Sequence, residues 1–412
     1  ISRIETRLFA GVFEPTHGSG ASAERAGTNE RWNFQFWDSN LERVFPSWDF
    51  ATSSHNSPLP DVLSEPPPSR MAAVPKTLTT PRLIAIEPSW RMFIQQGLLR
   101  LTEEALRGSP LWPFMGWRDQ GPNQSLARQA SLGKGATLDL SEASDRVSLE
   151  HAALLFHDHQ YLWSGILGCR SESVELLDGE ILPLKKFASM GSALCFPVES
   201  MVFTTIVFIA IARESGIPLP DIQNVYQGQV RVYGDDIIVP VEFALAVKEE
   251  LTKHGFVVNS SKSFWNGLFR ESCGSDWYNG HNVNYIKARA PLPLHRRDAE
   301  RISKLVALRN NLYEMGWFAT ARKIDTYLKR FIRLREVPVG HGSLGIWTYD
   351  QVIPDRVAPD MQVPEVRVPV LKVHPRVERL EGYGALMKFF HKRTEFPYAS
   401  DHLIHSGRPV SV

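Results

Sequence analysis

Two adjacent carboxylates, Asp235 and Asp236, stand in residues 230–240 (VRVYGDDIIVP) between two runs rich in β-branched side chains. Such runs predict strands, and the Gly-Asp pair between them predicts a tight hairpin turn. A hairpin that carries paired acids at its tip can bind divalent metal, and two metal ions can activate a hydroxyl and stabilise a leaving pyrophosphate. The alternative is a solvated turn, and the tetrapeptide alone does not separate the two.

A two-metal site needs another carboxylate, and Asp139 in residues 136–148 (ATLDLSEASDRVS) is the candidate. It ends a short apolar strand, so it can lie beside the acids of the hairpin, as nucleotidyl transfer requires. Asp145 follows six residues later, where a turn can bring it near a nucleotide sugar. A capping or ion-pairing role at the next helix has equal weight for Asp145.

A run of small residues at positions 187–200 (FASMGSALCFPVES) precedes a long apolar segment. Small side chains and Gly191 allow a nucleic-acid backbone or base to approach closely. The hydroxyls of Ser189 and Ser192 can form hydrogen bonds to ribose or phosphate. The alternative is a flexible entry into the following helix.

Four cations are candidates for phosphate contacts, and each is a weak signal by itself. Lys76 and Arg82 can clamp triphosphate oxygens. Lys262 can act as a general acid toward pyrophosphate. Arg270, in a turn-forming segment, is available for a phosphate or a primer end.

Residues 287–335 carry 13 Lys/Arg against 4 Asp/Glu, with apolar residues at helical spacing between them. The pattern predicts helices with an apolar side and a basic face. We interpret this face, with Arg296, Arg297 and Lys304, as a track for RNA backbone phosphates. Solvated helix faces without a ligand are the alternative.

The whole chain has 412 residues, a net charge of +1 and three widely spaced cysteines. This length predicts roughly three domain-sized units, and the cysteines predict neither a disulfide framework nor a metal site. The apolar stretch at residues 201–212 is too short for a membrane span and predicts a buried core helix. Because the chain begins at Ile1 without a methionine, we expect that an N-terminal piece is missing.

Local patterns place these residues on secondary structure. Ser89 is the expected N-cap of a helix over residues 89–107. Asp178-Gly179 predicts a hairpin within residues 174–184, and residues 198–213 form the buried helix. An amphipathic helix is expected over residues 242–254, closed by Gly255.

The segments PRLIAIEP with MFIQQG, LDLSEASDRVS, SMGSALCFPVES, VYGDDIIVP, NSSKSFW and FRESCG follow one another in this order. Together they span about residues 74–286. The set resembles the replicase subunit of levivirus-like single-stranded RNA bacteriophages, which is an RNA-directed RNA polymerase. The resemblance implies that Asp139 and Asp235 are the metal-binding acids, assisted by Asp236. It also implies that Lys76 and Arg82 clamp the incoming nucleotide and that Asp145 senses the ribose.

The further implications of the resemblance concern the loop, the fold and the partners. The loop at Ser189 and Gly191 would contact template and nucleotide, and Lys262 would serve the pyrophosphate side. The implied fold is an α+β right-hand polymerase: fingers at 1–130 with a nucleotide clamp at 74–100, palm at 131–286 with a fingers insertion near 160–187, and thumb with C-terminal extension at 287–412. The implied cofactors are two Mg²⁺ or Mn²⁺ ions. The implied partners are template and nascent RNA, nucleoside triphosphates, host translation elongation factors and a ribosomal protein, in the host cytoplasm without a membrane.

One feature departs from the pattern. Many animal-virus polymerases place an Asn in the small-residue loop to read the 2′-hydroxyl, whereas residues 192–200 contain none. Three alternatives also stay open: a reverse transcriptase-like polymerase, which would share the palm, a narnavirus- or ourmia-like RNA polymerase, and, because an N-terminal piece is expected to be missing, an inactive RNA-binding fragment.

Overall fold

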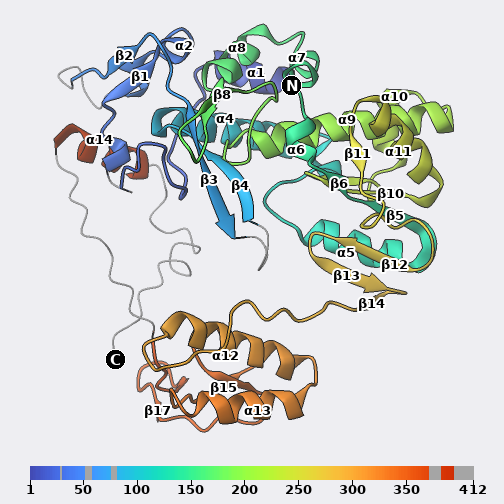
Figure 1. Ribbon diagram of the computed structural model, residues 1–412. Coiled ribbons are helices and arrows are strands. Elements are labelled where there is room, and N and C mark those ends of the chain that lie inside the picture. Colours follow the sequence, from blue (N-terminus) through green and yellow to red (C-terminus); the bar gives the residue numbers. More distant parts are fainter. Residues whose placement is uncertain (28–29, 52–57, 76–80, 371–381, 394–412) are drawn as a thin grey trace. The chain divides into compact units, whose positions relative to one another are not determined.

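The computed structural model describes the chain except residues 28–29, 52–57, 76–80, 371–381 and 394–412, and it consists of two compact units (Figure 1). Unit 1 contains Ile1–Val283 together with the helix α14 (Gly382–Arg393), and unit 2 begins at Asn284. Unit 1 mixes helices with mostly antiparallel strand pairs, and the described part of unit 2 combines helices with one parallel and one antiparallel pair. This mixture confirms the predicted α+β class.

A three-stranded antiparallel sheet lies at the centre of unit 1. Its strands are β5 (Gly135–Leu138), β10 (Asp236–Pro240) and β9 (Arg231–Tyr233), with β10 in the middle. Ile237 and Val239 of β10 are completely buried, and burial of each such side chain contributes about 1.5–3 kcal/mol. The β-branched runs therefore form strands, as predicted, and the acids lie at the end of this sheet.

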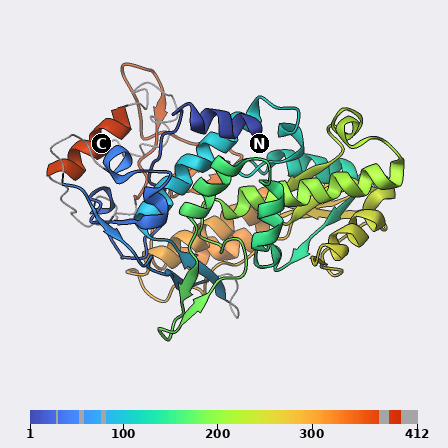
Figure 2. The ribbon, with the colours of Figure 1, turned by 90° about the horizontal axis from the view of Figure 1, so that it is seen from above.

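The helix α9 (Cys195–Ser215) is the long yellow-green helix in Figure 2 and packs beside this sheet. It ends at Gly216, whose positive φ of 69° provides a left-handed C-cap. Among the described residues α9 is the one helix with the length and hydropathy of a membrane span, but 78% of its apolar window is buried inside the protein. The prediction of a buried core helix is thus confirmed.

Shorter helices surround α9, and one of them matches a pattern in the sequence. The predicted helix before Gly255 is α11, and Gly255 follows it with a φ of 80°. The helices of this group are α6 (Ala143–Arg146), α7 (Leu149–Leu155), α10 (Leu219–Val225) and α11 (Ala244–Lys253). They pack on α9, so the sheet and the helix layer share one apolar core.

Two further small sheets flank the central one. One is a three-stranded antiparallel sheet that packs against α5 (Gly121–Gln129). The other is a two-stranded sheet that contains the short strand directly following β5 in the chain. Their strands are β12 (Phe269–Ser272), β13 (Ser275–Tyr278) and β14 (His281–Asn282), and then β6 (Leu140–Ser141) with β11 (Val257–Val258). These sheets hold the segments around Asp139 and residues 259–276 together.

The N-terminal part of unit 1 contains a four-stranded sheet in the order β4-β3-β7-β8. The strands are β3 (Ser69–Pro75), β4 (Pro81–Ile86), β7 (Ser173–Glu175) and β8 (Ile181–Pro183). The hairpin predicted at Asp178-Gly179 joins β7 to β8 and is confirmed. The pair of β3 with β7 is parallel, and it joins residues 69–86 to residues 173–183.

The remaining elements of this part pack around α4 (Ser89–Arg107). They are α1 (Ser2–Phe9), β1 (Phe36–Asp38), α2 (Ser39–Glu42), α3 (Ser47–Phe50), β2 (Asp61–Leu63) and α8 (Gln160–Gly168). The prediction of Ser89 as the N-cap of α4 is wrong, because Pro88 occupies that position. The backbone N–H of Ser89 instead donates to Glu24 Oε1 at 2.9 Å.

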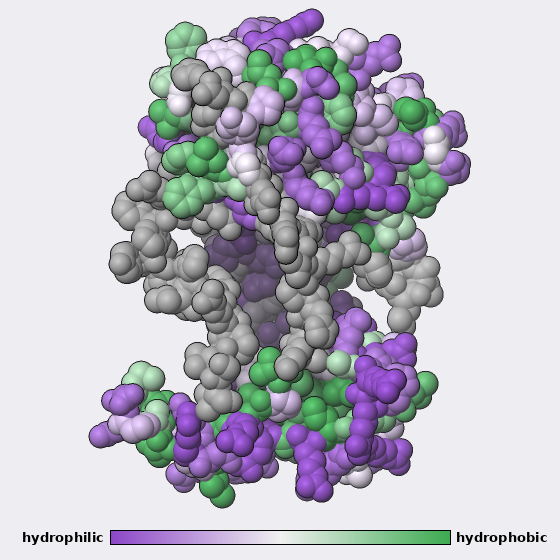
Figure 3. All heavy atoms as spheres, turned by 90° about the vertical axis from the view of Figure 1, so that its left-hand side faces the viewer, coloured by the Kyte–Doolittle hydropathy of each residue, from purple (hydrophilic) through white to green (hydrophobic). Residues whose placement is uncertain are grey.

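Unit 2 is built on two helices, α12 (Ala299–Glu314) and α13 (Phe318–Leu328), whose core contains Ile302, Leu305 and Leu328. The first helix predicted in this region is present, whereas the second ends at Leu328, and the apolar residues that follow pack on the core without helical structure. Four short strands complete the unit: β15 (Glu336–Pro338), β16 (Ile346–Thr348), β17 (Arg356–Val357) and β18 (Pro364–Glu365). Figure 3 shows hydrophilic side chains over much of its visible face, with apolar patches between them.

Candidate functional site

The turn between β9 and β10 presents the two adjacent acids. Tyr233 pairs with Asp236, so Gly234 and Asp235 form a two-residue loop. Gly234 has a φ of 59°, and a Cβ there would lie 2.1 Å from Cε2 of Phe196. Its N–H donates to Ser200 Oγ at 3.0 Å. Only glycine fits this position, and α9 thereby fixes the hairpin tip.

Asp139 lies directly after β5, across from the hairpin. Leu138 pairs with Ile237, so the register continued by one residue places Asp139 opposite Asp236. The backbone N–H of Asp139 donates to Ser263 Oγ at 3.0 Å, and Asn259 Nδ2 donates to its Oδ2 at 3.2 Å. The structure therefore brings the strand-end acid and the hairpin acids to the same end of one sheet, in the arrangement expected from the sequence.

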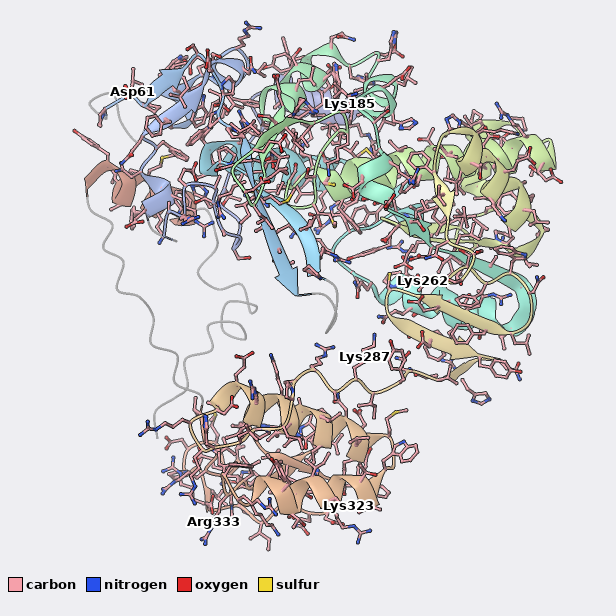
Figure 4. The ribbon with its side chains drawn as sticks, in the orientation of Figure 1. Asp61, Lys185, Lys262, Lys287, Lys323 and Arg333 are labelled. Atoms are coloured by element: carbon pink, nitrogen blue, oxygen red, sulfur yellow. The ribbon has the colours of Figure 1, made fainter. Side chains whose placement is uncertain are left out.

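Lys262 lies beside Asp139, with Nζ 3.9 Å from Asp139 Oδ2 (Figure 4). Its side chain is 57% exposed. The ammonium group can therefore reach both the acid and a solvent-borne ligand. Its predicted role as a proton donor to pyrophosphate stays a prediction.

Two carboxyls near the hairpin tip are destabilised in their charged form. Burial and the charge of Asp235 raise the pKa of Asp236 to about 7, although the N–H of Cys273 donates to its Oδ2 at 3.1 Å. Burial, Asp235 and Asp145 raise the pKa of Glu199, on α9, to about 8. Like charges in a partly buried site raise pKa values in this way because each disfavours ionisation of the others.

This donor set fits a divalent cation. Hard ions such as Mg²⁺ bind carboxylate oxygens, and a positive ion would stabilise the ionised forms of Asp236 and Glu199, which burial and neighbouring carboxylates disfavour. Among the described residues, however, no three His, Cys, Asp or Glu side chains form a ready-made metal cluster. Asp139, Asp235 and Asp236 therefore share one end of a sheet without forming a closed coordination shell.

Asp145 pairs with a cation that the sequence motifs did not indicate. It lies on α6, and Lys186 Nζ is 2.5 Å from its Oδ1. The side chain of Asp145 is 47% exposed and that of Lys186 is 24% exposed. The ion-pairing alternative for Asp145 is thus realised, but with the residue that directly precedes the small-residue run and not within the following helix.

The small-residue loop packs under β4. Gly191 has a φ of 126°, and a Cβ there would lie 2.0 Å from the carbonyl oxygen of Ala85, so this close approach requires glycine. Ser192 Oγ donates to Gln95 Oε1 at 3.2 Å, and Ser189 is 6% exposed. The two serines predicted to bind nucleotide are therefore part of the packing between this loop and its neighbours in the present conformation.

The predicted phosphate clamp is described in part. Arg82 lies on β4 and is exposed, within the sheet that contacts the small-residue loop. Lys76 lies outside the described residues. A phosphate contact by either residue stays a prediction.

Arg270, for which a contact with a phosphate or a primer end is predicted, lies inside the protein. It is completely buried, and its guanidinium donates to the carbonyl oxygens of Gly135, Gly267 and Phe269 at 2.5, 3.1 and 2.6 Å. A guanidinium that joins the start of β5 to the strand β12 holds the palm-like sheets together. In this conformation its guanidinium binds backbone carbonyl oxygens, and a contact with a phosphate or a primer end stays a prediction.

In unit 2, Arg296 and Arg297 are exposed, and Lys304 is exposed but pairs with Glu300 at 2.5 Å. Lys323 and Arg333 also lie on the surface of this unit (Figure 4). Arg309 differs, because it is buried and pairs with Asp325.

Sequence reasoning missed four residues of the site. Lys186 and Glu199 lie near Asp145, while Asn259 and Ser263 bind Asp139. An acid at the start of an otherwise apolar helix was a signal for Glu199. Asn259 and Ser263 stand in the NSSKSFW segment, which was considered only for Lys262, and no local pattern marks Lys186, whose contact arises only in the folded chain.

Comparison with known proteins agrees with this geometry. Residues 62–322 match the family model "RNA replicase, beta-chain". The RNA-directed RNA polymerase subunit beta of Enterobacteria phage SP is 34% identical over 285 residues, which is 67% of this chain and 46% of that protein. The corresponding subunit of Escherichia virus Qbeta is 33% identical over 67% of this chain and 45% of that protein.

Structural likeness is weaker. The RNA-dependent RNA polymerase of a human picorbirnavirus overlaps with a TM-score of 0.42 at 11% identity, over 64% of this chain and 55% of that chain. The chain spans a little under half the length of the curated relatives it matches. Since the family model covers most of the chain, this protein belongs to the RNA replicase β-chain family.

Proposed function

We propose that this chain supplies the catalytic palm of an RNA-directed RNA polymerase that copies a viral RNA genome from nucleoside triphosphates. One observation carries the proposal: antiparallel pairing of β5 with β10 places Asp139 opposite the acid hairpin at one end of a sheet. Family membership supports the same activity. The acids of this sheet are what an in-line attack of a 3′-hydroxyl on an α-phosphate requires.

The chain's own residues position and neutralise the reacting groups. Asp139 is oriented by Asn259 and Ser263, and Asp235 is held at the hairpin tip through Gly234. Lys262, beside Asp139, is placed to donate a proton to the departing pyrophosphate. Such fixed groups lower the barrier mainly through orientation and charge stabilisation.

Asp139, Asp235 and Asp236 would hold two Mg²⁺ or Mn²⁺ ions. When bound, these ions lower the pKa of the primer hydroxyl and neutralise the triphosphate. The raised pKa of Asp236 supports this assignment, because burial and then the charge of Asp235 disfavour its ionised form, which a bound cation would stabilise. Metal binding is therefore expected to ionise Asp236 fully at neutral pH.

The three-part division of a right-hand polymerase extends this proposal to the whole chain. Residues 1–130 would form part of the fingers, with the clamp residues Lys76 and Arg82. Residues 131–286 would be the palm, with a fingers insertion near 160–187, and residues 287–412 the thumb and a C-terminal extension. Helix α14 of that extension groups with unit 1 and not with the helices of unit 2.

The proposed partners follow from the same activity. Template and nascent RNA would contact the exposed cations Arg296 and Arg297. The chain would act as one subunit of a complex with host translation elongation factors and a ribosomal protein, in the cytoplasm of a bacterial host. These partners rest on the family resemblance.

Incorporation of nucleotides on a short RNA template with Mg²⁺ tests the proposal, in the full protein and its Asp235→Ala variant. We expect synthesis by the native protein and none by the variant, with RNA binding largely retained. Synthesis that persists in the variant would remove Asp235 from the site. Preferential use of deoxynucleotides by the native protein would instead support a reverse transcriptase, and RNA binding without synthesis an inactive fragment.

A further inference from the structure

The ion pair between Asp145 and Lys186 joins α6 to the segment before α9 and has no role in the mechanism above. The negative charges of Asp145 and Asp235 both act on Glu199, so Asp145 belongs to the same electrostatic cluster as the hairpin tip. Lys186 Nζ lies 2.5 Å from Asp145 Oδ1. This lysine therefore places a positive charge at the edge of a cluster of carboxyls.

The backbone around Lys186 is held from two sides. Arg170 donates to the carbonyl oxygens of Leu184, Lys186 and Phe187 at 2.8, 2.9 and 2.7 Å. The N–H of Phe187 donates to Val147 O at 2.8 Å, in the segment that follows α6. Because both ends of the ion pair stand on a fixed backbone, the ammonium reaches Asp145 without ordering a flexible loop.

The small-residue loop offers few other groups to read a ribose. Residues 187–200 contain no Asn or Gln. Ser189 is almost fully buried, and Ser192 Oγ donates to Gln95. The half-exposed carboxylate of Asp145 is thus the polar group of this region that is best placed to accept a hydrogen bond from a 2′-hydroxyl.

We propose that Lys186 is a positioning residue for sugar selection, which holds the Asp145 carboxylate where it accepts a hydrogen bond from the ribose 2′-hydroxyl of the incoming nucleotide. The inference rests on the proposed polymerase function and adds to it the residue that sets discrimination against deoxynucleotides. One carboxylate oxygen binds Lys186, and the other stays available for the sugar. A deoxynucleotide leaves that oxygen without a partner.

The expected effect is on selectivity and not on folding. An ion pair with this much solvent exposure contributes little to stability, so Lys186→Ala is expected to fold normally. A hydrogen bond to a charged group is typically worth enough to change a rate ratio by about tenfold or more. Without Lys186 the Asp145 side chain rotates among several positions, and the ratio of kcat/KM for ATP over 2′-dATP is expected to fall by about tenfold.

The experiment measures this ratio in the full replicase for the native protein and for Lys186→Ala, Lys186→Arg and Lys185→Ala. Lys185 is exposed and adjacent, so its variant removes the same charge without the ion pair (Figure 4). We expect a lowered ratio in Lys186→Ala, partial rescue in Lys186→Arg and a native ratio in Lys185→Ala. In an Asp145→Asn background, Lys186→Ala is expected to lower the ratio no further.

An unchanged ratio in an active Lys186→Ala variant would overturn this inference alone. Equal losses for ATP and 2′-dATP would overturn it too, because they would indicate a general charge effect. If Lys186→Ala makes no product, the rise in melting temperature caused by ATP is compared with the rise caused by 2′-dATP. A preference for ATP that is retained in the variant contradicts the proposal. A native protein that incorporates no nucleotide would remove the polymerase function itself.

Discussion

The two units of the chain use charge in opposite ways. In unit 1 several acids of the site are partly buried and influence one another, so that the pKa of Asp236 rises to about 7 and that of Glu199 to about 8. In unit 2 the charges are mostly cations, and many are exposed, such as Arg296 and Arg297 in the turn before α12. Its buried cation, Arg309, has a carboxylate partner in Asp325.

This contrast distinguishes charges suited to a reaction site from charges suited to the attraction of a charged ligand. Buried like charges cost free energy, and a fold retains them where a bound cation or substrate compensates them. Exposed like charges cost little and act over a Debye length of about 10 Å, which suits the attraction of a polyanion. We therefore expect single substitutions in unit 1 to change rates, and those in unit 2 to change affinity or stability.

The largest effect is expected for Asp139→Asn, which keeps the size of the side chain and removes its charge. RNA synthesis is expected to fall on the order of 10³-fold, since one group that stabilises developing charge is lost. RNA affinity is expected to stay the same or rise slightly. Single-turnover nucleotide incorporation and filter binding measure the two quantities.

Asp221→Asn is the matched control, because Asp221 is an exposed acid of unit 1 on α10, away from the central sheet. It is expected to leave both quantities unchanged. If Asp139→Asn weakened RNA binding as much as synthesis, the proposed division between chemistry in unit 1 and attraction in unit 2 would fail.

Much of the acid site was predictable because its signals are local. Gly234 between β-branched runs predicts the tight turn, and the structure shows both its positive φ and the strand pair. Asp139 at the end of an apolar strand predicts a position beside the hairpin, and the register of β5 with β10 provides it. Alternation and turn chemistry are contained in a few consecutive residues.

The unpredicted part depends on contacts between distant segments. A motif shows that Arg270 is a cation in a turn-rich stretch, but not that its guanidinium points inward to Gly135 O. The pair of Lys186 with Asp145 joins residues 41 positions apart. Likewise, the helix α4 begins at Ser89 without a side-chain cap, because the acceptor for its N–H comes from Glu24.

The next largest effect is expected on the stability of unit 2. Arg309→Ala leaves Asp325 without its partner and removes the donor to Trp347 O. Loss of one member of a buried ion pair typically costs about 3–5 kcal/mol. In thermal unfolding of the full chain, this variant is expected to show a transition at a lower temperature than the native protein. Arg296→Ala, at an exposed position, is expected to leave the transition temperature unchanged.

A smaller effect is expected on the pH dependence of the stability of unit 1, measured in EDTA so that no divalent metal ion is bound. The folded-state pKa of Glu199 is raised to about 8, from an ordinary value of 4.5. The folded protein therefore binds more protons than the unfolded chain between these values, and its stability falls as pH rises through this window. The slope has an upper limit of about 1.4 kcal/mol per pH unit.

Glu199→Gln removes this titration. We therefore expect the melting temperature of the variant to change less between pH 5.5 and 8.5 than that of the native protein. Glu214→Gln, at an exposed acid of the same helix, is the control and should keep the native slope. Equal slopes of melting temperature against pH for the native protein and Glu199→Gln would show that the charged form of Glu199 is not destabilised. The contrast between the units would then lose its basis in unit 1.

The smallest effect tests the second part of the contrast, which is the expected attraction of RNA by the cations of unit 2. The double variant Arg296→Ala/Arg297→Ala is expected to lower RNA affinity a few-fold and to reduce the slope of log affinity against log salt by about 0.7 for each RNA phosphate that the variant no longer neutralises. Arg296→Lys/Arg297→Lys keeps both charges and is expected to keep the slope. Because counterion release depends on charge and not on the shape of the side chain, a reduced slope in the Lys variant would indicate bidentate recognition. An unchanged slope in the Ala variant would mean that these two arginines do not contact RNA.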